Sequence, residues 1–203
     1  MVPFFPGFDR DRDAPAAACL DERDAMEPVE IEFFKPERRR YRSVLHRRDG
    51  LVIELDGGGY NKVGGAAREL PHDLAHFVVE DGLGLEAGLW GVLAAGGMFG
   101  HAKVIEGRRP PHAAKRAQAV VDATGDRLSQ AEMLTRFVCD LALDGADHDV
   151  RRLKAAAGAR WWRETTAEQL SGTCRALRAA SVRWHDLRAG EALKVLWRLP
   201  PMR

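Results

Sequence analysis

Residues 29–55, VEIEFFKPERRRYRSVLHRRDGLVIEL, contain three short runs in which apolar and polar side chains alternate. The runs cover residues 29–34, 40–47 and 51–55, and each has a period of two residues. This period is typical of a β-strand that buries one face. The Asp-Gly pair between the last two runs favours a tight hairpin turn, because it tolerates the positive φ that such turns need. The segment therefore predicts paired antiparallel strands.

Charged side chains on the first two runs are predicted to pair with each other. The first run carries Glu30 and Glu32, and the second carries Arg40 and Arg42. Opposite charges on neighbouring strands stabilise the pairing by about 0.2–1 kcal/mol per pair. We therefore interpret the arginine-rich stretch RRRYR as a neutralised strand face and not as a nucleic-acid-binding patch.

The C-terminal run at 191–198 alternates in the same way, and we expect it to return to the N-terminal sheet. The sequence between these strands predicts mainly helices. The predicted fold class is therefore α+β, with a small antiparallel sheet of N-terminal hairpin strands plus the C-terminal strand, packed against a mainly helical body. We expect a single domain over 28–203. A flexible N-terminal arm is expected over 1–27, where Pro, Asp, Arg and Ala occur without a period.

Local signals predict several helix boundaries. A helix over about 71–83 begins at a proline, whose missing N–H costs nothing in the first turn, and ends at Gly84. The next helix, over about 85–97, is rich in Gly and Ala beside Leu and Trp, so we expect it to be buried. Two later helices are expected to open with capping boxes. The residues of these capping boxes are Ser129 with Glu132 and Thr165 with Glu168.

The overall composition argues against several classes of protein. The chain has 203 residues, of which 45% are hydrophobic and 30% charged, and this is typical of a globular protein. Its net charge of +1 argues against a dedicated nucleic-acid binder. No run of about 18 apolar residues predicts a membrane span. The three separated cysteines form no C-x-x-C pair, which favours a cytoplasmic location over a disulfide framework.

The segment at 69–84, ELPHDLAHFVVEDGLG, places four potential metal ligands on the first predicted helix. At about 100° per residue, the side chains of His72, Asp73, His76 and Glu80 share one arc of roughly 100°. Residues four apart stand one above the other on a helix, so both histidines can reach one ion. The apolar residues fill the rest of the helical wheel.

This pattern, H-D-x-x-H-x-x-x-E, predicts a divalent metal site. Imidazole and carboxylate ligands suit zinc, and they also suit iron or manganese in a more open site. We predict His72, His76 and Glu80 as the metal ligands. The alternatives for the third ligand are Asp73, Glu86 and His101.

Asp73 and Glu80 are also the predicted catalytic acids. Either one would hold an imidazole N–H or act as a general base on a metal-bound water. The predicted function is a metal-dependent enzyme, a hydrolase or a lyase, that acts on a small-molecule substrate.

The H-D-x-x-H core at 72–76 resembles the mark of the zinc-binding coenzyme Q biosynthesis family. In that family a glutamate ligand follows the core after eleven residues. Here this position is Gly88, whereas Glu86 stands two residues earlier and Glu80 belongs to the same helix. The resemblance covers five residues. It implies that such a pair of histidines can open a zinc site, and we do not assign the chain to the family.

Two other functions are compatible with the sequence. If His76 and Glu80 form an ordinary surface pair, the chain is a non-catalytic α+β interaction module, an adaptor or a homodimer, without metal. Its contact residues would be Trp161, Trp162 and the aromatic N-terminal arm, because aromatic side chains are enriched at interfaces. A nucleic-acid binder that uses RRRYR and the basic stretch GRRPPHAAKR is the weakest alternative, because the net charge is +1.

Overall fold

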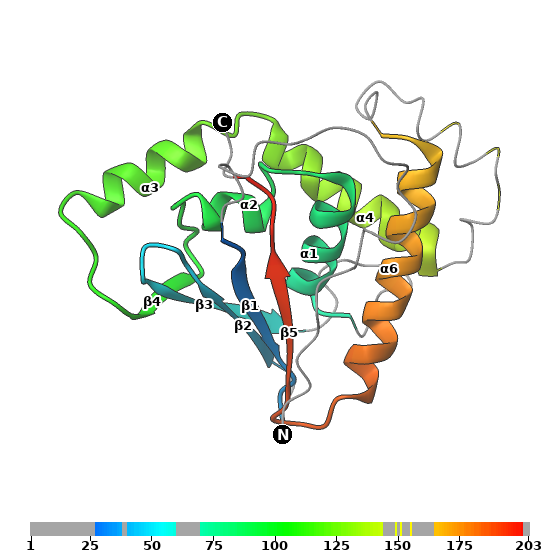
Figure 1. Ribbon diagram of the computed structural model, residues 1–203, viewed down its shortest axis with the longest axis horizontal. Coiled ribbons are helices and arrows are strands. Elements are labelled where there is room, and N and C mark those ends of the chain that lie inside the picture. Colours follow the sequence, from blue (N-terminus) through cyan, green and yellow to red (C-terminus); the bar gives the residue numbers. More distant parts are fainter. Residues whose placement is uncertain are drawn as a thin grey trace.

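The computed structural model describes residues 27–37, 40–59, 70–143, 149, 151, 155 and 165–200. Within them, five strands form one sheet and five helices accompany it, so the predicted α+β fold is confirmed (Figure 1). The strands are β1 (Val29–Phe34), β2 (Arg40–His46), β3 (Val52–Gly59), β4 (Ala102–Glu106) and β5 (Ala192–Trp197). The helices are α1 (His72–Leu83), α2 (Leu89–Ala94), α3 (Ala113–Asp122), α4 (Arg127–Leu143) and α6 (Ala167–Asp186).

The strands follow the order β4-β3-β2-β1-β5, and every neighbouring pair is antiparallel. The C-terminal strand β5 lies beside β1, with Val195 opposite Ile31, so its predicted return to the N-terminal sheet is confirmed. The turn between β2 and β3 is tight, and Gly50 adopts a φ of 78° there. A residue without a Cβ reaches this left-handed region at little cost, as the Asp-Gly pair predicts.

The edge strand β4 is not predicted by the sequence analysis. It pairs with β3, where Val104 lies opposite Ile53, and most of its residues are exposed or half-buried. A strand of five residues with one shallow apolar face carries a weak local signal. Its conformation is therefore determined by pairing with β3 and not by its own alternation.

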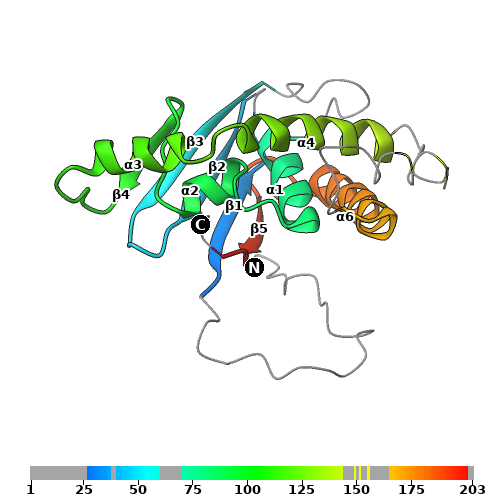
Figure 2. The same ribbon diagram turned by 90° about the horizontal axis from the view of Figure 1, so that it is seen from above.

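The inner face of the sheet packs on α1 and α2 through aromatic side chains. Phe77 of α1 lies 6.2 Å, between ring centroids, from both Phe33 of β1 and Trp197 of β5. Trp90 of α2 contacts the same Phe33 edge-on at 5.5 Å. Helix α1 also contacts α2, α4 and α6, so it is the central helix of the core (Figure 2). The residues of α1 are thereby held between the sheet and the other helices.

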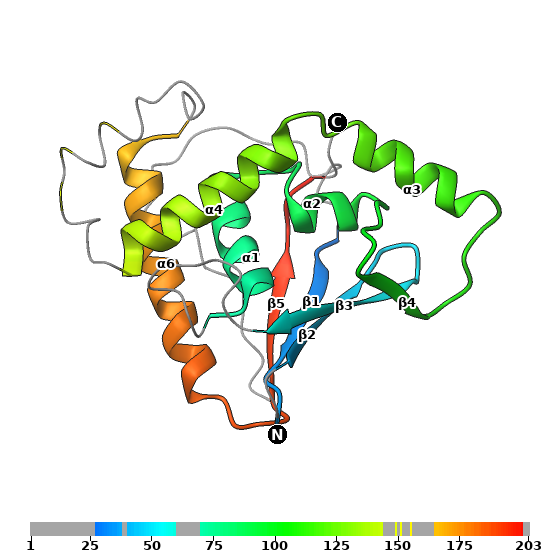
Figure 3. The ribbon, with the colours of Figure 1, turned by 180° about the vertical axis from the view of Figure 1, so that it is seen from behind.

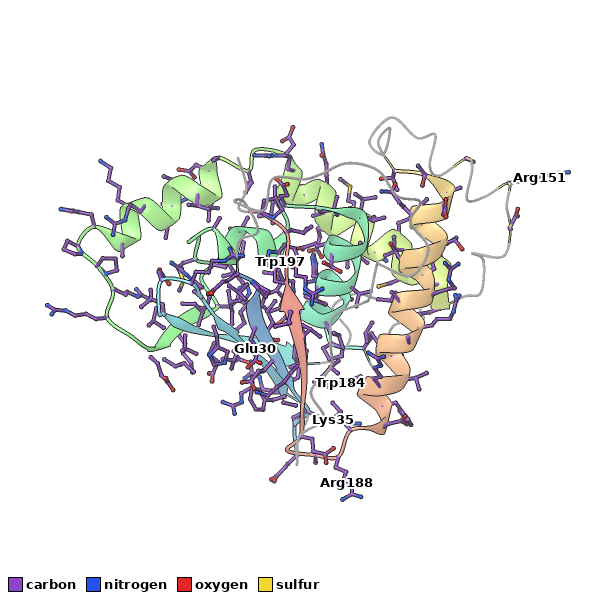
Figure 4. The ribbon with its side chains drawn as sticks, in the orientation of Figure 1. Glu30, Lys35, Arg151, Trp184, Arg188 and Trp197 are labelled. Atoms are coloured by element: carbon purple, nitrogen blue, oxygen red, sulfur yellow. The ribbon has the colours of Figure 1, made fainter. Side chains whose placement is uncertain are left out.

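Helix α6 is hydrogen-bonded to the residue that follows β1. Helix α3 lies on the opposite side of the molecule (Figure 3). Lys35, which follows β1, donates hydrogen bonds to the carbonyls of Trp184 at 2.9 Å and His185 at 2.7 Å (Figure 4). The last carbonyls of a helix have no partner within the helix, and a lysine satisfies them well. This contact fixes the C-terminal end of α6 against the sheet.

The predicted charge pairing between β1 and β2 is wrong, because the register places other residues opposite each other. Arg42 lies opposite Phe34 and forms its ion pair with Glu54 of β3, at 3.1 Å. On β1, Glu32 contacts Lys194 of β5. The arginines are therefore neutralised by acids of β3, and the glutamates by Lys194 of β5, with His46 of β2 also 3.3 Å from Glu32.

The helix predicted over 85–97 is shorter than expected. Helix α2 covers Leu89–Ala94, and its N-cap Gly88 is extended, with φ −85° and ψ −166°. The chain crosses from α1 to α2 over 85–88 because the first N–H groups of α2 bind Glu80, as described below. The predicted burial is confirmed, since all but the last residue of α2 are buried.

Both predicted capping boxes differ from the observed helix starts. Helix α4 begins at Arg127, so Ser129 and Glu132 lie inside the helix. Helix α6 is capped one residue later than predicted, by Thr166 with Gln169, because these two exchange side-chain and backbone hydrogen bonds. Two further expectations concern the arm over 1–27 and the contact residues Trp161 and Trp162. Apart from Glu27, these residues lie outside the described part of the chain.

Candidate metal centre

Helix α1 presents its two histidines to one point. His72 and His76 are one turn apart, and their ring centroids are separated by 4.5 Å. His76 and Glu80 are almost completely buried, with 1% and 0% of their surface exposed, so they do not form the solvated surface pair that was the alternative. The helix ends as predicted at Gly84, which adopts a φ of 70°. The polar arc that the sequence predicted therefore faces the protein interior at His76 and Glu80.

Glu132 of α4 joins these histidines, although its position after Ser129 predicted that it caps a helix. Its Oε1 lies 3.1 Å from Nε2 of His72, and its Oε2 lies 2.9 Å from Nε2 of His76. One ligand atom from each of the three residues lies within 4.8 Å of the others. Glu132 follows His76 by 56 residues, and no local spacing links the two. Only the packing of α4 on α1 brings the carboxylate to the histidines.

Glu80 holds the other side of the His76 ring. Its Oε1 accepts hydrogen bonds from His76 Nδ1 at 2.9 Å and from the Leu89 N–H at 2.7 Å, and its Oε2 accepts from the Trp90 N–H at 2.9 Å. The two backbone donors belong to the first residues of α2, and the unpaired N–H groups at the start of a helix favour a negative charge. Glu80 was predicted as a metal ligand and catalytic acid. The structure places it at Nδ1, opposite the nitrogen that faces Glu132.

Gly88 makes room for this buried carboxylate. A Cβ atom on Gly88 would lie 2.2 Å from the carboxyl carbon of Glu80, which is far inside van der Waals contact. Gly88 is also the position at which the coenzyme Q biosynthesis pattern has its glutamate ligand. The side chain of Glu80 occupies the space next to this position.

Asp73 stands in a corresponding position beside His72. Its Oδ2 accepts a hydrogen bond from Ser43 Oγ at 2.9 Å, and its Oδ1 accepts one from the Tyr41 hydroxyl at 3.3 Å. The same Oδ1 lies 3.5 Å from Nδ1 of His72. Burial, together with the negative charge of Asp73, raises the pKa of Tyr41 far above its usual range, so the phenol remains a donor. Strand β2 therefore fixes the orientation of this second acid.

Each imidazole thus has the same two kinds of neighbour. A buried acid lies at Nδ1, and the shared carboxylate of Glu132 lies at Nε2. Metal-binding histidines commonly donate their second N–H to a carboxylate, which fixes the tautomer and leaves the other nitrogen for the ion. The arrangement fits two Nε2 ligands and one carboxylate ligand.

The electrostatic environment favours positive charge between the two helices. Burial alone would lower the pKa of His76, but hydrogen bonds to Glu132 and Glu80 outweigh it and raise this pKa to about 9. Burial is likewise outweighed at His72, whose pKa is raised by Asp73 and Glu132. The two imidazoles hold the pKa of Glu132 well below its usual range. Glu132 therefore stays ionised beside the two histidines.

The charge of the cluster suits a divalent ion. With its three carboxylates ionised and both imidazoles protonated, the cluster would carry −3 + 2 = −1. A divalent ion that displaces both protons contributes the same +2. The exchange leaves the net charge of this partly buried cluster unchanged, so it avoids the cost of burying additional charge.

The histidines and Glu132 line a cleft of about 470 Å³ between α1, α4 and the segment after α2. His101, one of the alternative third ligands, also lines this cleft. Neither His101 nor Glu86 belongs to the group of ligand atoms that lie within 4.8 Å of one another in the described part of the chain. A centre formed by His72, His76 and Glu132 would therefore open toward a cavity of ligand size.

A second group of potential ligands lies on the outer face of the sheet. Glu30, Glu32 and His46 also come within 4.8 Å of one another. Here Lys194 already neutralises both glutamates, and its ammonium lies 3.1 Å from Glu30. A single imidazole and a competing lysine make this group an ordinary strand-face ion pair network.

Comparison of the chain with protein-family models, with curated proteins and with solved structures found no match. Among the residues that the structure describes, no helix has the length and apolar character needed to cross a membrane.

Proposed function

We propose that His72, His76 and Glu132 bind a divalent metal ion and that the chain is a metal-dependent enzyme acting on a small molecule. Zinc is the ion that two imidazoles and one carboxylate favour, and iron or manganese fits the same ligands in a more open site. Reactive zinc sites use three protein ligands and leave a position for water or substrate.

One observation carries the proposal. The Nε2 atoms of His72 and His76 converge on the same carboxylate at 3.1 Å and 2.9 Å, while both Nδ1 atoms face buried acids. A histidine that serves only as a core hydrogen-bonding group needs no second histidine aimed at its partner. The exposed side of Glu132, whose side chain is 59% exposed, gives the ion access from solvent.

The proposal assigns separate tasks to the acids. When bound, the ion would polarise a carbonyl or activate water, which suits a hydrolase or a lyase. Glu132 would be the third ligand, whereas Asp73 and Glu80 would orient the imidazoles and keep their Nε2 atoms free for the ion. Proton transfer would fall to a group that lines the cleft, and His101 is such a titratable group outside the cluster.

Zinc binding by protein purified without a histidine tag tests the proposal. Calorimetric titration with Zn²⁺ alone is expected to give one ion per chain, and His76→Ala and Glu132→Ala are each expected to abolish that binding. His46→Ala is the matched control, because it removes a histidine that also faces a glutamate but lies on the outer face of the sheet. This control should bind zinc as the wild type does.

The alternative function, a non-catalytic interaction module, predicts a different outcome of the same experiment. The wild type would then bind no zinc, and the titrations of wild type and variants would be indistinguishable. Loss of binding in His46→Ala, with binding kept in His76→Ala, would instead move the metal site to the outer face of the sheet.

A further inference from the structure

The cleft beside the cluster has a wall that is chemically unlike the cluster itself. Apolar side chains from α2, from α4 and from the segment after α2 line it together with the histidines and Glu132. These side chains are Leu89, Phe99, Leu128 and Met133. A cleft of about 470 Å³ that pairs apolar walls with a few polar groups is typical of a site for a small organic ligand.

Two rings that line this cleft stack on each other. The rings of Phe99 and His101 stack at 5.9 Å between centroids, with an angle of 9° between their planes. The segment that carries them is held in place, because Ala102 N–H donates to the Phe99 carbonyl at 3.0 Å and Asp56 N–H donates to the His101 carbonyl at 3.4 Å. The stacked pair is therefore a supported surface between α2 and β4, against which an apolar group can lie.

Met133 provides a second apolar contact. It follows Glu132 on α4, lines the cleft, and is 43% exposed, which is unusual for a large hydrophobic side chain among the described residues. Methionine adapts its shape to different apolar ligands because its side chain is unbranched and polarizable. Its position next to a proposed metal ligand places apolar surface at the edge of the proposed site.

We infer that the ligand of this cleft is a small molecule with an oxygen-donor head group and an apolar body. The inference rests on the proposed function, since the metal ion at His72, His76 and Glu132 would hold the head group. The apolar body would lie against Phe99 and Met133. His101 lines the same cleft and stacks on Phe99.

Two metal-chelating probes that share one head group test this inference. Acetohydroxamate has a methyl group as its body, and benzohydroxamate has a phenyl ring. Binding to the zinc-loaded protein is measured by calorimetry, with the zinc occupancy determined first by titration with Zn²⁺ alone. We expect benzohydroxamate to bind at least about 10-fold more tightly, because a phenyl ring removes much more apolar area from water.

Variants of the wall locate the contact. Phe99→Ala and Met133→Ala are each expected to reduce the preference for benzohydroxamate by about 3-fold or more, because the phenyl ring loses more apolar contact than the methyl group of acetohydroxamate does. Ile105→Ala is the matched control, since Ile105 is a large side chain with 42% exposure that is not among the residues lining the cleft. Met133→Ala alters an exposed position on α4, so it tests the inference even if Phe99→Ala fails to fold.

The outcomes separate this inference from the proposed function. If the wild type binds no zinc, the proposed function fails and the inference fails with it. If zinc binds but the two hydroxamates bind equally well, the metal centre stands and the apolar ligand class is refuted. A benzohydroxamate preference that survives in both wall variants would refute the inference as well, because the apolar contact would then lie elsewhere.

Discussion

Replacing Glu80 by glutamine is expected to destabilise the fold, although the two side chains have nearly the same shape. The carboxylate is fully buried and accepts hydrogen bonds from three donors, which are His76 Nδ1 and the N–H groups of Leu89 and Trp90. A glutamine amide has only one oxygen. In either orientation of the amide, its NH₂ group faces a backbone N–H, so one buried donor loses its acceptor.

The magnitude follows from these three contacts. An unsatisfied buried donor costs about 1–3 kcal/mol, and hydrogen bonds to a charged group are worth about 1.5–3 kcal/mol each. Removing one member of a buried ion pair adds to this cost. We therefore expect Glu80→Gln to lower the free energy of unfolding by roughly 2–4 kcal/mol. At about 2–4 °C per kcal/mol for a chain of this size, the melting temperature should fall by about 4–16 °C.

Glu132→Gln is the matched control. Glu80→Gln should be the less stable of the two variants, whereas Glu132→Gln should have the lower zinc affinity. In urea unfolding with a chelator present, Glu132→Gln should cost less than about 1 kcal/mol, because its side chain is 59% exposed. In zinc titrations, Glu80→Gln should weaken binding about 10–100-fold, because the carboxylate that orients the His76 imidazole is lost. Glu132→Gln should weaken it further, because a ligand is lost.

Stability that is unchanged in Glu80→Gln, or lower in Glu132→Gln than in Glu80→Gln, would refute this division of roles. Equal zinc affinities in the wild type and Glu132→Gln would show that Glu132 is not a ligand.

Two further predictions concern pH and packing. The pKa of His76 is raised from 6.5 to about 9 in the folded chain, so its contribution to the stability of the metal-free protein is complete below about pH 6.5 and is lost as pH rises through 9. Zinc must displace this proton, so zinc affinity should rise over the same range, and flat calorimetric profiles between pH 6.5 and 9 would contradict the assignment. Gly91→Ala should destabilise by about 1–3 kcal/mol in thermal unfolding, because its Cβ would lie 1.9 Å from the Glu86 carbonyl oxygen. Gly172→Ala in α6, whose Cβ would meet nothing closer than Arg175 at 3.8 Å, should be neutral or stabilising, and equal losses in both variants would argue against close packing at α2.

Local patterns were sufficient for the elements whose signals lie within a few residues. The alternation in 29–34 and 191–198 predicted two strands, and Gly50 and Gly84 predicted where a turn forms and a helix ends. These features depend on the period of side chains and on the φ angle of one residue, which the sequence specifies directly. By contrast, β4 has a weak signal of its own and forms because β3 offers unpaired backbone groups.

In the candidate site, too, some features follow from local spacing and others from helix packing. The spacing of His72, Asp73, His76 and Glu80 on one helical arc was sufficient to predict that these side chains act together, because residues three and four apart are neighbours on any helix. Whether that arc faces water or protein depends on the packing of α2 and α4 against α1. The helical wheel alone does not contain this information.

Tertiary structure alone decided what each acid does. The sequence by itself determined the α+β class, the two histidines and the candidate acids, since these follow from local periodicity. It could not determine that Glu80 binds the start of α2 or that Glu132, 56 residues after His76, completes the cluster. Contacts between distant elements depend on how helices pack, and no spacing along the chain encodes the distance between a carboxylate on α4 and an imidazole on α1.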